Sequence, residues 1–130
     1  MRDRARVIIL VTILVMATGA ISGDETVAYN THFGLAKSVP EADSKVLSPN
    51  AIQLWFTQIP QDNSVGIRLI DPVGDLVETG LSMQGAEDQK NFNIQVKESL
   101  DTGAYVVAWR GIGDDGHVVR GDFSFTVDVR

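Results

Sequence analysis

The stretch "NAIQLWFTQ", residues 50–58, alternates apolar and polar side chains. Ile52, Leu54 and Phe56 fall on one face of an extended chain, and the residues between them fall on the other. Successive side chains of a β-strand point to opposite faces of a sheet, so this period of two predicts a strand with one buried face.

The same period of two recurs along the rest of the chain. Three further apolar sets share one face of an extended segment: Val65, Ile67 and Leu69; Phe92, Ile94 and Val96; and Phe123, Phe125 and Val127. The segment "GAYVVAWRG", residues 103–111, is also strand-like, and a short run begins at Leu76 after the Asp71–Gly74 breaker. Turn residues separate these segments every ten or so positions, and no segment carries a useful helical stripe.

A short first strand is indicated by Phe33 and Leu35 and is closed by a turn at Val39-Pro40. Short strands separated by regular turns are typical of β-sandwiches. The sequence therefore predicts an all-β fold, a Greek-key, Ig-like β-sandwich of about seven strands.

The aromatic residues are expected to be structural. Tyr105 stands at the start of its strand, where its hydroxyl could bond back to the preceding loop as the tyrosine corner of Greek-key sandwiches. The alternative is a core aromatic with a solvated end, and the sequence leaves both open. Trp55 and Trp109 are expected to pack rather than to bind a ligand.

The first 23 residues differ in character from the rest. Three arginines within the first six residues precede an apolar run over 7–16 and small residues over 17–23. This order predicts a signal peptide over 1–23, because the apolar run is shorter than the roughly 20 residues of a spanning helix. An uncleaved N-terminal anchor is the alternative. We expect an exported, periplasmic or extracytoplasmic protein with a linker over 24–31 and a single domain over 32–130.

The charge balance excludes some partners. The chain of 130 residues has a net charge of −6, and loss of three arginines and one aspartate with residues 1–23 makes it −8. Such a surface repels nucleic acid and anionic lipid and suits a cation. The chain has no cysteine, so a transition metal would need imidazole, carboxylate, amide or backbone ligands.

Few residues in the sequence indicate a catalytic or binding function. There is no phosphate-binding glycine loop, nucleophile elbow or zinc-spaced cluster. What remains is Asp115-Gly116-His117 within "GIGDDGHVVRGDF", residues 111–123, together with His32 far upstream. Residues two apart project to one side of an extended chain, and a nitrogen and oxygen donor set favours Cu(II). The alternative is a plain turn, because Asp-Gly is among the strongest turn dipeptides.

Several motifs occur together in an order that resembles the copper-resistance protein CopC family. They are "HFGLAKSVPEADSKV" at 32–46, "AIQLWFTQ" at 51–58 and "LDTGAYVVAWRGIGDDGHVVRGDFSFTV" at 100–127. The resemblance covers nearly all of residues 32–130. It implies a small copper-binding β-sandwich with a Cu(II) site at His32, Asp115 and His117.

The resemblance also separates this chain from some family members. A Cu(I) site would need several methionines, and the middle of this domain has only Met83, so no Cu(I) site is expected. Gln58 stands where some relatives place a glutamate near Cu(II), and it brings no charge. Asp114 is either a secondary electrostatic contributor or a turn residue.

His32 differs from the family pattern in its place along the chain. The family histidine is typically the first residue of the mature protein, where its free α-amine also binds the metal. Cleavage after Ala20 or Gly23 would leave His32 internal and the site with fewer nitrogen donors. Later trimming that exposes His32 is the alternative, and a frayed terminal arm without a metal role is a third.

The resulting hypothesis is an exported Cu(II) carrier or buffer in copper resistance or homeostasis, not an enzyme. Its expected partners are the copper ion and a membrane copper transporter, with no nucleic acid and no direct membrane binding unless the leader is uncleaved. The alternative is a metal-free Ig-like extracytoplasmic interaction module. The two differ in whether His32 and the Asp115–His117 segment meet at one end of the sandwich.

Overall fold

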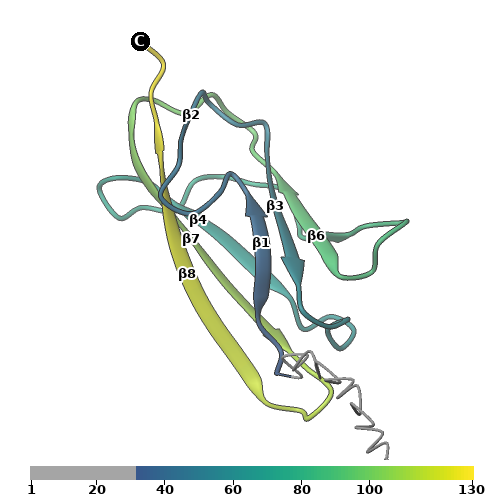
Figure 1. Ribbon diagram of the computed structural model, residues 1–130. Helices are drawn as coiled ribbons and strands as arrows, with labels where there is room; N and C mark the ends of the chain where they lie inside the picture. Colours follow the sequence, from purple (N-terminus) through teal and green to yellow (C-terminus); the bar gives the residue numbers. More distant parts are fainter. Residues whose placement is uncertain (1–31) are drawn as a thin grey trace, which may run out of the picture.

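Burial along several of the strands follows the alternation of the sequence. The computed structural model describes residues 32–130 (Figure 1), and the predicted signal peptide over 1–23 and linker over 24–31 lie outside these residues. In β3 (Ala51–Phe56), Ile52, Leu54 and Phe56 are almost completely buried, as their spacing predicted.

Two four-stranded sheets face each other across the core (Figure 1). The first has the order β1 (Leu35–Val39), β3, β6 (Asn91–Gln95) and β5 (Met83–Gln84). The second has the order β2 (Lys45–Val46), β8 (Val118–Val127), β7 (Gly103–Ile112) and β4 (Gly66–Ile70). Neighbours are antiparallel except β2 and β8, which are parallel. This is the strand arrangement of an Ig-like sandwich, so the predicted fold class is confirmed.

The strands differ from the prediction in detail. Eight are present in residues 32–130, and two of them, β2 and β5, have only two residues each. The run that begins at Leu76 forms no strand. Leu76 makes an isolated bridge to Ile70 beside one sheet, and Thr79 makes another to Val96 beside the other. The segment crosses between the sheets there, so it cannot follow either one for long.

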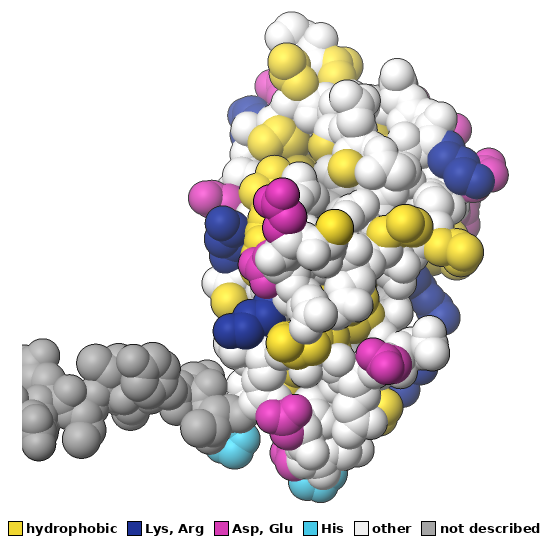
Figure 2. Space-filling model, turned by 90° about the vertical axis from the view of Figure 1, so that its right-hand side faces the viewer, with side chains coloured by type: hydrophobic (Ala, Val, Ile, Leu, Met, Phe, Trp, Pro, Cys, Tyr) yellow, Lys and Arg dark blue, Asp and Glu magenta, His cyan; other side chains and the backbone are white. Residues whose placement is uncertain are grey.

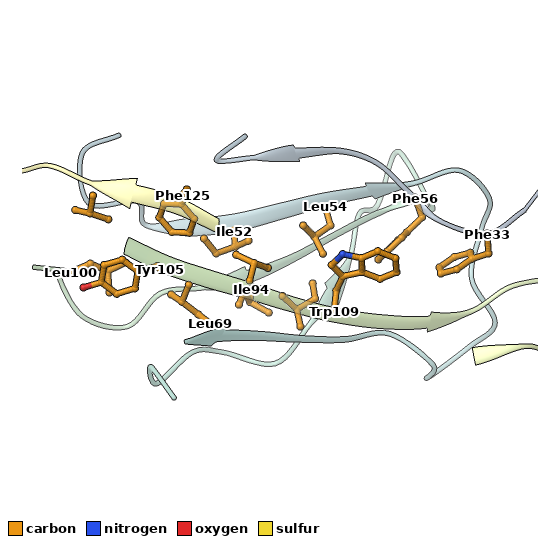
Figure 3. Packing of buried hydrophobic residues seen from close by; sticks show 13 residues of the cluster. Phe33, Ile52, Leu54, Phe56, Leu69, Ile94, Leu100, Tyr105, Trp109 and Phe125 are labelled. Carbon is orange, nitrogen blue, oxygen red and sulfur yellow. The ribbon is translucent and has the colours of Figure 1, made fainter. Parts of the chain in front are cut away.

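The core lies between the sheets and is continuous along the sandwich (Figure 3). Ile52, Leu54 and Ile94 of the first sheet face Leu69 and Val107 of the second, all at most 1% exposed. Full burial of such a side chain contributes about 1.5–3 kcal/mol, so this layer supplies much of the folding energy of a domain without disulfides.

Tyr105 closes one end of the core. Its hydroxyl donates a hydrogen bond of 2.9 Å to the carbonyl oxygen of Asp101, and its ring stacks on Phe125 at 5.9 Å. Burial raises the pKa of Tyr105 above its ordinary value. The tyrosine-corner interpretation is therefore confirmed.

Aromatic rings close the opposite end (Figure 3). The ring of Phe33 stacks on Phe56 at 5.0 Å, and Trp109 meets both rings edge-on at 6.5 and 5.5 Å. Trp55 is half-buried beneath the Lys37 ammonium, 4.3 Å from its ring centre. Both tryptophans pack, as expected. Residues 32–130 contain no helix, and so none that could cross a membrane.

Candidate metal centre

The β7–β8 hairpin carries two of the predicted site residues at its tip. The Gly116 N–H donates to the Gly113 carbonyl at 3.0 Å and closes a turn over 113–116. Gly116 has φ +77°, a left-handed conformation that glycine adopts without strain. The turn exposes both Asp114 and Asp115 and leads directly into His117. The turn predicted from Asp-Gly is therefore present.

Asp115 holds His117 through two contacts. Its Oδ1 accepts the backbone N–H of His117 at 3.0 Å, and its Oδ2 lies 3.2 Å from Nδ1 of the same residue. The pKa of Asp115 is lowered, chiefly by the backbone hydrogen bond and further by the charges of the His117 and His32 rings. The carboxylate is thus ionised at neutral pH, and one imidazole nitrogen already has an oriented partner.

His32 lies beside the turn of the same hairpin because its neighbour Phe33 is buried against that end of the hairpin. A Cβ placed on Gly111 would be 2.6 Å from Cζ of Phe33, and one on Gly113 would be 2.6 Å from Cβ of Phe33. The two glycines therefore make the seat for the Phe33 side chain. Thr57 fixes the adjoining backbone, since its hydroxyl donates to the His32 carbonyl at 2.8 Å and accepts the Gly34 N–H at 3.0 Å.

The loop after β3 supports the hairpin from the side. Gln58 Oε1 accepts the Asp114 N–H at 3.2 Å. Gln61 donates twice, from its side chain to the Gly113 carbonyl at 3.0 Å and from its backbone N–H to the Ile112 carbonyl at 2.8 Å. Thr57 and Gln61 were missed in the sequence, because a polar residue after a strand has no motif of its own. Only Gln58 had been placed near the site.

The three predicted residues thus lie at one end of the sandwich but are not assembled around a point. Figure 2 shows the histidine side chains at the same end of the molecule, with acidic side chains close by. Asp115 and His117 are in contact, and His32 is near enough to act on the pKa of Asp115. Yet residues 32–130 contain no group of three or more His, Cys, Asp or Glu side chains placed to hold a metal ion.

The donor chemistry fits Cu(II) nonetheless. Two imidazoles and an ionised carboxylate form a nitrogen and oxygen set of the kind that Cu(II) accepts. His117 is exposed over 83% of its side chain, and His32 is also exposed, so neither ring is fixed by packing. Met83, the one methionine in the described part of the chain, is 61% exposed on β5.

Comparison with known proteins places this sandwich among copper-related relatives. The family model of the CopC domain matches residues 35–128. Copper resistance protein C of Escherichia coli is 33% identical over 108 residues, covering 74% of this chain and 81% of that protein. Protein YobA of Escherichia coli K12 is 29% identical over 97 residues, covering 74% and 78%.

A solved structure gives the same result. The crystal structure of selenomethionine PcoC, a copper resistance protein from Escherichia coli, superimposes with a TM-score of 0.68 at 33% identity. The match covers 73% of this chain and 99% of that one. The family match includes the hairpin with Asp115 and His117 and begins three residues after His32.

Proposed function

Because this chain belongs to the CopC domain family, we propose that it binds Cu(II) and serves as an exported carrier or buffer of that ion, not as an enzyme. A relative named for copper resistance supports the copper role. The leader-like pattern of the first 23 residues supports export. A membrane copper transporter is the partner that such a carrier would serve.

One observation carries the proposal: the arm bearing His32 is seated on the hairpin that bears Asp115 and His117. Phe33 occupies the space left by Gly111 and Gly113, so His32 cannot move far from the hairpin without emptying that seat. The two histidines, which come from distant parts of the sequence, are thereby kept at one end of the sandwich with their side chains exposed.

Copper would complete the site by drawing exposed side chains together. His32 and His117 would supply imidazole nitrogens, and Asp115 would supply an anionic oxygen. The lowered pKa of Asp115 keeps this oxygen ionised at neutral pH without a proton to displace. Asp114 adds negative charge nearby, while Gln58 supports the turn and adds none. With Met83 alone in the domain, we expect no Cu(I) site.

The state of the N-terminus sets the strength of the site. If the leader is removed after Ala20 or Gly23, His32 contributes only its imidazole. If trimming exposes His32, its α-amine can join the same ion and binding becomes tighter. Mass determination of the secreted protein distinguishes the two forms.

A metal-free interaction module is the second candidate. It is favoured by the absence of an assembled ligand group in residues 32–130 and by the turn hydrogen bonds, which account for the hairpin without a metal. Under this candidate, the loops at this end would contact another protein directly.

A Cu(II) titration of the secreted protein, followed by electron paramagnetic resonance, separates the two candidates. We expect one bound ion with nitrogen coupling, and weaker binding in His32→Ala and in His117→Ala. Asp115→Asn should also weaken binding. Asp75→Asn, which removes an exposed carboxylate from the turn after β4, is the matched control and should not. Unchanged binding in both histidine variants would reject the site.

A further inference from the structure

The outer face of the second sheet contains a hollow rimmed by arginines. It has a volume of about 410 Å³, and Arg68 of β4, Arg110 of β7 and Arg120 of β8 line it. The register places Gly66, Arg110 and Arg120 in one row across the three strands, and Arg68, Ala108 and Asp122 in another row of the same face. The three guanidinium groups therefore rise from adjoining rows.

Small residues keep the floor of the hollow low. A Cβ added to Gly66 would lie 3.0 Å from Nε of Arg110, so the arginine side chain extends over the bare backbone of β4. Ala108, which lies between Arg68 and Asp122 in the neighbouring row, adds only a methyl group to this floor. The side chains that rise around this floor are charged.

These arginines have no acidic partner in residues 32–130. The ion pairs found there involve Lys45, Lys97, His117 and Arg130. Asp122 also lines the hollow, but it forms no ion pair with any of the three arginines there. Arg110 and Arg120 are directly opposite each other, and like charges so placed disfavour the strand pairing. The hollow therefore has a net positive charge that no ion pair within residues 32–130 neutralises.

The positive charge of this hollow contrasts with the negative charge of the whole chain. The whole sequence has a net charge of −6, and three of the eight lysines and arginines after residue 31 line this one hollow. An acidic molecule is repelled by most of the surface and attracted here, which fixes its orientation on the sandwich.

We propose that this hollow is the docking site for an acidic segment of a partner protein. Planar guanidinium groups bind carboxylates through paired hydrogen bonds. Strands β4 and β8 flank β7, so the arginines span about 10 Å across the sheet, since neighbouring strands are about 4.8 Å apart. A segment that presents several Asp or Glu side chains covers that span, whereas one small anion reaches only part of it.

The hollow also lies close to the candidate metal centre. Arg120 is three residues from His117, about 10 Å along the strand at about 3.4 Å per residue. The row between them contains Ile112 and Val118, and Val118 is 51% exposed. A partner seated on the arginines would thus lie beside the hairpin. A role of this docking in copper transfer rests on the proposed function. The docking itself does not depend on that function.

The test is an NMR titration of the copper-free protein with an end-blocked peptide of four Glu residues, one Trp and one Gly. We expect amide shifts confined to the outer face of β4, β7 and β8, with binding that weakens as salt is added. Arg110→Gln combined with Arg120→Gln should weaken binding about tenfold or more, because two charge-assisted contacts are lost. Lys90→Gln combined with Lys97→Gln removes the same charge elsewhere and should not.

Each contrary result has a clear meaning. No shifts at low salt, or equal weakening in both double variants, would overturn the proposal. Binding to phosphatidylglycerol vesicles or to inorganic phosphate without binding to the peptide would overturn it as well. A dispersed spectrum of each variant verifies its fold. The Arg110→Gln, Arg120→Gln variant should bind Cu(II) as the unmodified protein does, which would show that the loss of peptide binding does not arise from damage to the metal site.

Discussion

Phe33 lies so close to Gly113 that a Cβ on the glycine would be only 2.6 Å from the Cβ of Phe33. This contact joins the two segments on which the candidate site depends. It links the start of the sandwich, where His32 stands, to the hairpin that bears Asp115 and His117.

Gly113→Ala should damage the site through this contact. The added methyl group must displace Phe33, at a cost of about 1–3 kcal/mol as in other overpacked cores, and the His32 arm moves with it. Urea unfolding and Cu(II) titration measure the two effects. Gly34→Ala is the control, because its Cβ would meet nothing within 4 Å. Equal stability and equal Cu(II) binding in the two variants would contradict a role for the contact between Phe33 and Gly113.

Gln58→Glu should strengthen Cu(II) binding. The carboxylate can still accept the Asp114 N–H that Gln58 accepts at 3.2 Å, and it adds one negative charge near the site. The attraction between two unit charges that lie about 4 Å apart in water is about 1 kcal/mol, which corresponds to a roughly fivefold gain in affinity. Competition with a chelator of known affinity measures it. Glu87→Gln changes charge on an exposed loop residue and should leave affinity unchanged.

Asp115 should titrate below 3.8, its ordinary value. A lowered pKa in the folded protein means that the ionised carboxylate stabilises the fold above the unfolded value, and that this contribution is lost as pH falls through the folded value. NMR of the side-chain carboxyl carbon measures the pKa. His117→Ala should raise it only in part, because the backbone N–H, the chief cause, remains. A pKa at or above 3.8 in the unmodified protein would show that the hydrogen bond is absent in solution.

Tyr105→Phe should destabilise the opposite end without affecting copper. The change removes the 2.9 Å hydrogen bond to the Asp101 carbonyl and keeps the ring, so we expect a loss of about 0.5–1.5 kcal/mol. Thermal unfolding with and without Cu(II) checks both parts. Weakened Cu(II) binding in this variant would show that the two ends are coupled.

Bound Cu(II) should raise the unfolding temperature, and a chelator should reverse the rise. An ion that binds only the folded chain adds about 2.7 kcal/mol of stability at a free concentration of 100 times its Kd. Calorimetric scans at increasing Cu(II) measure the effect. In the combined variant His32→Ala, His117→Ala the rise should vanish, and its persistence there would point to ligands elsewhere.

The alternation of side chains in "NAIQLWFTQ" and its companions was enough to predict the sandwich, because burial of one face is what a strand sequence encodes most directly. Tyr105 could be located as well. The Leu76 run was misjudged, since crossing between sheets is decided by partners that the local pattern does not include. At the site, the hairpin and Gln58 were foreseen, but the support from Thr57 and Gln61 was not. Those contacts join residues more than twenty positions apart through ordinary side-chain to backbone hydrogen bonds.

The edge-on packing of Trp109 against Phe33, at 6.5 Å between ring centres, has an optical consequence. It places an intrinsic fluorophore in direct contact with Phe33, the residue that follows His32. A paramagnetic ion at the proposed site should quench the emission of this indole more strongly than that of Trp55, which lies beneath Lys37. The protein therefore carries its own luminescent reporter of metal occupancy.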